Sequence, residues 1–272
     1  MPLILCGTPI GNLGDASRRL AEALQSADVV FVEDTRRSRR LLDHLGIDKP
    51  LRSFFAGNEQ LRVRELSERL TRGETVALIT DAGMPAISDP GLTAVRAARA
   101  IRAEVTVVPG PSAVTAALAA SGLPSERFVF EGFLPRKGGD RSHRIDQIAQ
   151  ETRTVVFFAS PKRVGRDLED LAGVVGGERA VFVARELTKL HEELWWGTLG
   201  EAVDRFRDPQ RGEFTLVLGG APFREPDLDE ALEEVRALMA EGEPLAGAVR
   251  EVAQRLRVPR GRLYEAALSD KG

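Results

Sequence analysis

Apolar runs suited to buried strands alternate with helix-spaced apolar residues through the first 120 positions of the chain. The strand-like runs cover residues 3–6, 28–33, 51–55, 75–79 and 105–108. The helix-like stretches cover residues 17–26, 37–45, 59–71, 91–102 and 112–121. Regular alternation of this kind is typical of a mostly parallel sheet with helices on both faces. We therefore expect an α/β domain over residues 1–120.

Strands dominate the pattern after the break Ser-Gly-Leu-Pro at 121–124. Strand-like runs cover residues 127–132, 153–158, 180–184, 192–197 and 213–218, and helices are expected at 161–172 and 199–206. A segment with more strands than helices favours a mixed sheet over a parallel one. Residues 121–221 are therefore expected to form a second α/β domain, which ends at the linker Gly-Gly-Ala-Pro of 219–222.

The remaining residues, 222–272, have helix-spaced apolar positions over 228–240 and 245–256, and a short helical piece over 262–268. Two helices joined by a short turn that contains glycine predict a helix-turn-helix arrangement. This small C-terminal segment has two interpretations, a nucleic-acid-binding element and a helical cap or dimerisation element. The arginines that would serve the first are Arg250, Arg255, Arg257, Arg260 and Arg262.

Loops rich in glycine and proline follow three strands of the first domain. The longest, residues 80–91, reads T-D-A-G-M-P-A-I-S-D-P-G, and shorter loops cover residues 7–12 and 109–113. The carboxyl ends of parallel strands meet at one edge of a sheet, where ligands bind in open α/β folds. Glycine allows the main chain to approach a ligand closely. The three loops together favour a binding crevice over ordinary surface turns.

Composition excludes several classes of protein. The chain has 272 residues and a formal net charge of −3, which excludes a uniformly basic nucleic-acid wrapper but not a local basic patch. Its one cysteine, Cys6, lies in the first apolar run and is expected to be buried, and the absence of disulfides suits a reducing compartment. The three histidines show no metal-ligand spacing, so no metal site is assigned. Without a membrane-length apolar stretch or a secretory pattern, we expect a soluble cytoplasmic protein.

Nine short motifs, in this order, resemble those of a known family. They read T-P-I-G-N-L at 8–13, E-D-T-R at 33–36, D-A-G-M-P-A-I-S-D-P-G at 81–91, P-G-P-S-A at 109–113, S-G-L-P at 121–124, F-V-F-E-G-F-L-P-R-K at 128–137, A-R-E-L-T-K at 184–189, G-E at 212–213 and L-Y-E-A-A-L at 263–268. The chain resembles the bacterial 16S ribosomal RNA cytidine 2′-O-methyltransferases, within the tetrapyrrole-methylase superfamily of S-adenosylmethionine enzymes. The E-D-T-R and A-R-E-L-T-K elements separate this family from its tetrapyrrole-modifying relatives.

The resemblance implies two α/β domains with a cleft between them for S-adenosylmethionine, followed by a small helical segment. The residues that it assigns to the cofactor are Pro9, Gly83, Met84, Ile87, Ser88, Asp89, Ser112, Ala113, Ala159 and Ala184. Four positions depart from the family pattern: Met84 is usually threonine, Thr80 is usually serine, Gly57 stands where a histidine is common, and Gly261 stands where a lysine is common. A mechanism that requires that histidine as a base does not carry over to this chain.

Methyl transfer from a sulfonium needs mainly the alignment of donor and acceptor in a partly dry cleft. The acceptor that the family implies is a ribose hydroxyl, whose proton a carboxylate or a lysine within hydrogen-bond reach can accept. The candidates for this role are Asp34, Glu59, Glu186 and Lys189, each of which a surface ion pair also explains.

Two groups of basic residues, at 36–40 and 135–144, favour contacts with a phosphate backbone, although a solvated helix also explains the first group. We expect the second group to be a flexible cationic loop that clamps RNA at the mouth of the cleft. The residues assigned to RNA are Arg36, Arg136, Lys137 and Arg141. The partners that the family implies are 16S ribosomal RNA, within the small ribosomal subunit, and a second copy of the chain in a homodimer.

Three functions are compatible with the sequence. The favoured one is S-adenosylmethionine-dependent 2′-O-methylation of a cytidine ribose in 16S ribosomal RNA of the small subunit. The second is a methyltransferase that acts on a tetrapyrrole or another small molecule, because one fold supports both activities. The third is a noncatalytic regulator that binds nucleic acid through the C-terminal helices, which leaves the three glycine-rich loops unexplained.

Overall fold

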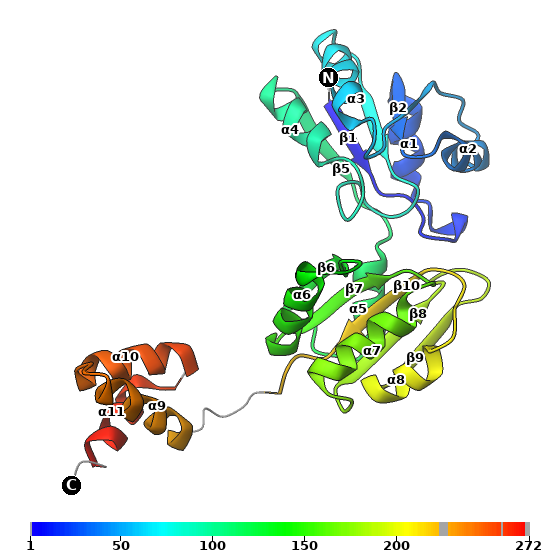
Figure 1. The fold of residues 1–272 in the computed structure, drawn as a ribbon. Helices are drawn as coiled ribbons and strands as arrows, with labels where there is room; N and C mark the ends of the chain where they lie inside the picture. The colour runs from blue at the N-terminus through cyan, green and yellow to red at the C-terminus, as the bar shows by residue number, and fades with distance from the viewer. Residues whose placement is uncertain (1, 223–227, 257, 270–272) are drawn as a thin grey trace. The chain divides into compact units, whose positions relative to one another are not determined.

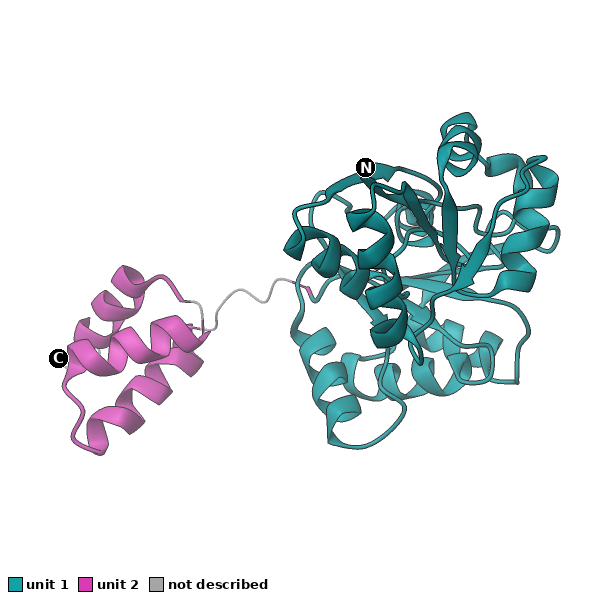
Figure 2. Cartoon of the chain, turned by 90° about the horizontal axis from the view of Figure 1, so that it is seen from above, with its two compact units in different colours: residues 1–221 teal, residues 222–272 magenta. Residues whose placement is uncertain are grey.

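The computed structural model describes residues 2–222, 228–256 and 258–269. The chain divides into two compact units, residues 1–221 and residues 222–272, which Figure 2 shows in different colours. The first unit contains two five-stranded sheets (Figure 1). This arrangement confirms the α/β fold class with a C-terminal helical segment, whereas the division of the first unit at residue 120 stays a prediction.

The first sheet is parallel throughout, with the strand order β3-β2-β4-β1-β5. Its strands are β1 (Pro2–Cys6), β2 (Val29–Val32), β3 (Leu51–Ser53), β4 (Val76–Ile79) and β5 (Glu104–Val108). The helices of this half are the 3-10 turn η1 (Leu13–Asp15), α1 (Arg18–Ser26), α2 (Thr35–His44), α3 (Glu59–Thr71) and α4 (Leu92–Ala100). Strands β2 and β4 are buried at every residue, which explains their unbroken apolar sequence.

Helices cover both faces of this sheet, as the alternation predicts. Alternate strand residues such as Val30 and Ala77 pack on the side of α1 and α2, together with Cys6. Their neighbours Phe31 and Leu78 pack on the opposite side, against α3 and α4. Cys6 is fully buried, and burial raises the pKa of its thiol to about 12.

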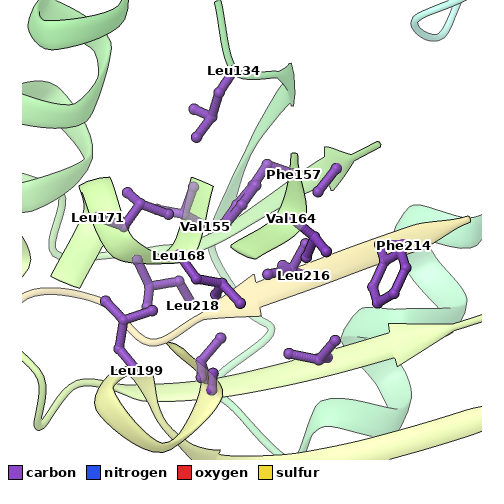
Figure 3. Packing of buried hydrophobic residues seen from close by; sticks show 14 of the residues in the cluster. Leu134, Val155, Phe157, Val164, Leu168, Leu171, Leu199, Phe214, Leu216 and Leu218 are labelled. Carbon is purple, nitrogen blue, oxygen red and sulfur yellow. The ribbon is translucent and has the colours of Figure 1, made fainter. Parts of the chain in front are cut away.

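The second sheet is mixed, as predicted, with the strand order β6-β7-β10-β8-β9 and one parallel pair, β6 with β7. Its strands are β6 (Phe128–Phe133), β7 (Thr154–Ala159), β8 (Ala180–Arg185), β9 (Glu193–Thr198) and β10 (Phe214–Leu218). Helices α6 (Gly139–Gln150), α7 (Val164–Val175) and α8 (Leu199–Phe206) cover one face. Figure 3 shows this core, in which Leu168 and Leu171 of α7 lie over Val155 and Leu216 of the sheet.

Helix α5 (Ala113–Ser121) covers the other face of the second sheet (Figure 1). Its residues Val114 and Leu118 pack in one cluster with Val156 and Val217. Its position directly after the fifth strand predicts a helix of the first domain. The structure instead gives it to the second sheet, so the chain leaves the first sheet at the loop before α5.

Helix α6 contradicts the expected flexible loop over residues 135–144. Ile145 and Ile148 of this helix are buried in the core of the second sheet. Arg141 is only 5% exposed and forms ion pairs with Asp167 at 2.9 Å and Asp170 at 2.6 Å. The assignment of Arg141 to RNA was therefore wrong, because its guanidinium is buried and neutralised by two carboxylates of α7.

The second unit is a three-helix module made of α9 (Leu228–Ala240), α10 (Leu245–Leu256) and α11 (Arg260–Ser269). It has its own apolar core, which includes Val235, Val252 and Leu263. Helices α10 and α11 match the two predicted helices, while Arg257, which lies between them in the sequence, is outside the described residues. None of the helices in the described ranges is long and apolar enough to cross a membrane.

Candidate active site

The three glycine-rich loops meet at the carboxyl edge of the first sheet. Thr8 and Gly83 exchange backbone hydrogen bonds, with N···O distances of 2.9 Å and 3.2 Å. Gly7 lies so close to Gly110 that a Cβ atom on Gly7 would be 2.6 Å from the Gly110 nitrogen. A larger residue at position 7 would therefore force the loops apart. The predicted convergence of the loops is confirmed.

A cavity of about 290 Å³ opens beside these loops, close to the lower end of the range of about 300 to 1,000 Å³ for small-ligand pockets. Loops of the first sheet supply part of its wall, namely Ile10, Ala82, Gly83, Met84, Ile87, Ser88, Asp89 and Ser112. Helix α5 and the second sheet supply the rest, namely Ala113, Val114, Phe133, Phe158, Ala159, Ser160, Pro161, Ala184, Leu187, Glu213, Phe214 and Thr215. The pocket therefore lies between the two sheets of the first unit.

Nine of the ten residues that the sequence analysis assigned to the cofactor lie in this wall; Pro9 does not, although its neighbour Ile10 does. The residues that sequence reasoning missed come mainly from the second sheet. Ala159 of β7 and Phe214 of β10 are paired, so the end of one strand and the start of the other meet at the pocket. Because antiparallel pairing of this kind cannot be read from a single sequence, Phe214 and Thr215 were not predicted to line the pocket.

The longest loop is held in an unusual conformation at the pocket. Gly83 has a φ of +75°, and Ala86 and Ser88 have φ values of 68° and 61°. Such angles are costly for residues with a side chain and cluster at functional sites. Glu59, at the start of α3, supports the end of this loop, because its carboxylate accepts a hydrogen bond of 3.0 Å from the Gly91 amide. This contact gives Glu59 a structural role outside the pocket wall.

The E-D-T-R motif is tied to the same loop by reciprocal hydrogen bonds. The Asp34 amide donates to Asp81 at 3.0 Å, and the Asp81 amide donates to Glu33 at 3.3 Å. Arg37 completes the contact with an ion pair of 3.2 Å to Asp81. The motif therefore orients the long loop from the neighbouring strand β2.

Asp34 itself begins α2, where its carboxylate accepts hydrogen bonds from the Arg36 side chain and from the Arg36 amide at 2.8 Å. These hydrogen bonds lower the pKa of Asp34 to about 2. A carboxylate with so low a pKa is a weak proton acceptor at neutral pH. Arg36 is highly exposed, but Asp34 neutralises its charge.

Asp89 is the acidic group of the long loop that reaches the pocket wall. Burial, and next the nearby charge of Glu33, raise the pKa of Asp89 to about 6. Burial also raises the pKa values of Glu33 and Asp81. Asp89 therefore makes this side of the pocket wall acidic, and Glu33 and Asp81 lie close enough for their charges to raise its pKa.

Lys189 joins Glu186 and Glu213 at the rim of the pocket. Its ammonium group lies 2.7 Å from Glu186 and 2.8 Å from Glu213, and its aliphatic stem packs on Gly11. Burial lowers the pKa of Lys189, but the hydrogen bonds to both carboxylates outweigh it and leave the pKa raised. Burial likewise raises the pKa of Glu186, but hydrogen bonds from Lys189 and the Glu213 amide outweigh it and leave the pKa lowered. The group therefore stays charged and connects the second sheet to the loop at residues 7–12.

Comparison with known proteins identifies the family. Residues 2–203 match the model for tetrapyrrole (corrin/porphyrin) methylases. The chain belongs to the tetrapyrrole methylase family. Within this family it is similar to proteins named ribosomal RNA small subunit methyltransferase I. The one from Synechocystis is 43% identical over 98% of this chain and 97% of its own, and the one from Mycobacterium tuberculosis is 45% identical over 99% and 95%.

A third relative of that name, from Thermotoga maritima, is 46% identical over 98% of its own length but over only 80% of this chain. Two solved structures of similar fold also cover only part of the chain. The methyltransferase CobJ covers 82% of it with a TM-score of 0.61, and uroporphyrin-III-C-methyltransferase from Thermus thermophilus covers 80% with a TM-score of 0.56. Both are 20% identical to this chain, so they show the fold alone.

Proposed function

We propose that this protein transfers a methyl group from S-adenosylmethionine to the 2′-oxygen of a cytidine ribose in 16S ribosomal RNA of the small subunit. The observation that carries the proposal is the pocket itself, whose wall is built from the loops that hold the family motifs. The proposal is supported by relatives that are 43% to 46% identical and are named ribosomal RNA small subunit methyltransferase I. We place this activity in the cytoplasm.

The residues of the pocket fit this cofactor. Apolar side chains such as Ile10 and Phe158 offer surfaces for an adenine ring, and the carboxylate of Asp89 suits a positively charged sulfonium. When bound, the cofactor supplies an activated methyl group. The residues that we assign to it are Gly83, Met84, Ile87, Ser88, Asp89, Ser112, Ala113, Ala159 and Ala184 of the pocket wall, with Pro9 beside them.

We assign the acceptance of the ribose proton to Asp89. Of the four candidates from the sequence, Asp34 caps α2, Glu59 supports Gly91, and Glu186 and Lys189 hold Glu213, so none lines the pocket. Asp89 does line it, and its pKa of about 6 suits a general base near neutral pH. We assign Glu186 and Lys189 a positioning role at the rim.

We assign Arg136 and Lys137 to the RNA backbone, because both side chains are exposed in the loop that follows Phe133 of the pocket wall. Arg36 remains a weaker candidate for such a contact, since Asp34 neutralises it. We further propose that the protein acts as a homodimer, the symmetric state most common among soluble oligomers.

A transfer assay tests the proposal. Purified protein is incubated with methyl-labelled S-adenosylmethionine and with small ribosomal subunits from a strain that lacks the gene, and in parallel with a tetrapyrrole. We expect the label in 16S ribosomal RNA. Label in the tetrapyrrole alone would reject the proposal and favour the small-molecule alternative.

A further inference from the structure

Three loops of the second sheet end side by side at the pocket. They are the β6–α6 loop (134–138), the β7–α7 loop (160–163) and the α8–β10 loop (207–213). Pro161 accepts a backbone hydrogen bond of 3.2 Å from Gln210, which joins the second loop to the third. Leu134 accepts one of 3.5 Å from the Arg163 side chain, which joins the first loop to the second. The three loops therefore form one continuous edge.

Each of these loops has a pocket-wall residue at or next to it, and each carries at least one exposed cation. The wall residues are Phe133, Ser160, Pro161 and Glu213. The exposed cations, none more than four residues from a wall residue, are Arg136, Lys137, Lys162 and Arg211. The cations therefore lie along the mouth of the pocket on the side of the second sheet.

None of these four cations forms an ion pair with a carboxylate among residues 2–222, 228–256 and 258–269. By contrast, Arg144 of the same half pairs with Glu131, and Arg205 pairs with Glu193. Asp140 and Asp208 also stand exposed near this edge, so it is not uniformly basic, but neither of them pairs with the four cations. These four positive charges are therefore available to an external anion, although the chain as a whole has a net charge of −3.

The opposite side of the pocket mouth differs in charge. Asp89 comes from the long loop of the first sheet, and the nearby arginines Arg36 and Arg37 are neutralised by Asp34 and Asp81. A polyanion is repelled from that acidic side and attracted to the unpaired cations on the other. The difference in charge between the two sides therefore favours a polyanion that lies along the second sheet.

We propose that Lys162 and Arg211 extend Arg136 and Lys137 into one phosphate-binding rim, and that the backbone of the acceptor RNA strand lies along the second sheet while the target ribose enters the pocket. This inference rests on the proposed function. Contacts with phosphate position a strand without reading its sequence. The rim therefore supplies affinity, and the pocket selects the atom that is methylated.

The test compares two double variants of the full chain, Lys162→Ala with Arg211→Ala, and Arg99→Ala with Arg102→Ala. The second pair removes two exposed cations at the end of α4, just before β5 begins at the opposite edge of the first sheet. Binding of a fluorescein-labelled single-stranded oligoribonucleotide is measured by anisotropy between 50 and 200 mM salt. Calorimetry with S-adenosylmethionine checks that the pocket is intact.

Each phosphate contact on single-stranded RNA contributes about 0.7 to the slope of log affinity against log salt. We expect Lys162→Ala with Arg211→Ala to have a slope shallower by about 1.4. Between 50 and 200 mM salt, the factor by which its RNA affinity falls should therefore be about sevenfold smaller than the factor for the wild-type protein. The cofactor affinity of this double variant should not change, and the control pair should behave as wild type.

The proposed rim is refuted if Lys162→Ala with Arg211→Ala keeps the wild-type salt slope while Arg136→Ala with Lys137→Ala has a shallower one. That result would leave the proposed function standing. An equal loss in the rim and control variants also refutes the proposed rim, because net charge alone would then explain the binding. If the wild-type protein neither binds RNA with a salt-dependent affinity nor methylates it, the proposed function itself fails.

Discussion

Replacing Asp89 by asparagine removes a carboxylate that the fold holds in an unfavourable environment. The pKa of Asp89 is raised from 3.8 to about 6 by burial and then by Glu33. The folded protein therefore binds this proton more tightly than the unfolded chain does. Below pH 3.8 the carboxyl is protonated in both states and does not affect the free energy of unfolding. As the pH rises from about 4 to about 6, the unfolded chain ionises first and the free energy of unfolding falls. The full difference in pKa corresponds to at most about 3 kcal/mol.

Asparagine cannot ionise, so Asp89→Asn should escape this penalty. The difference in unfolding free energy between variant and wild type should grow by up to about 3 kcal/mol between pH 4 and pH 7. The assay is urea unfolding followed by tryptophan fluorescence, because both tryptophans, Trp195 and Trp196, lie in β9 of the first unit. Ser112→Ala, another pocket-wall change, should give a difference that does not vary with pH. A constant or falling difference for Asp89→Asn would refute the reasoning.

The same variant tests catalysis. If Asp89 accepts the ribose proton, kcat should fall by about 10²- to 10⁴-fold, in addition to any rise in the KM for S-adenosylmethionine from the loss of a carboxylate beside the sulfonium. The wild-type rate should rise with pH through about 6, as the carboxylate ionises, and the variant should lose this dependence. A raised KM with an unchanged kcat would instead limit Asp89 to cofactor binding.

Three further changes have defined outcomes. Gly83→Val should abolish calorimetric binding of S-adenosylmethionine, because the φ of +75° is strained for a branched residue; tight binding would show that the loop is misassigned. Arg136→Ala with Lys137→Ala should make the salt dependence of RNA binding shallower by about 1.4 and spare cofactor binding, and an unchanged slope would argue against phosphate contacts there. Lys189→Met should lower the transfer rate without removing RNA affinity, because Glu186 and Glu213 lose their shared cation; a wild-type rate would exclude the positioning role.

The central strands of the first sheet were readable from the sequence because a parallel strand buried on both faces is a continuous apolar run. Each strand predicted there is found within two residues of its expected ends, as with β4 at Val76–Ile79. The pocket loops were found for a related reason. Parallel strands place all their carboxyl ends at one edge, so loops far apart in sequence are predicted to meet.

The failures have physical causes too. Helix α6 was missed because glycine and charged residues dominate its start, and only the buried Ile145 and Ile148 signal its inner face. Arg141 looked like a surface cation because its partners Asp167 and Asp170 lie on α7, about 30 residues along the chain. The roles of Asp34 and Glu59 in capping and loop support depend on hydrogen bonds that no sequence pattern displays.

The most direct test of the central claim is mass-spectrometric mapping of 16S ribosomal RNA from a strain that lacks the gene, complemented with the wild-type or the Asp89→Asn protein. We predict that one cytidine lacks its ribose methyl group in the deletion strain, regains it with the wild-type protein, and does not regain it fully with the variant. An unchanged methylation pattern in the deletion strain would contradict the account.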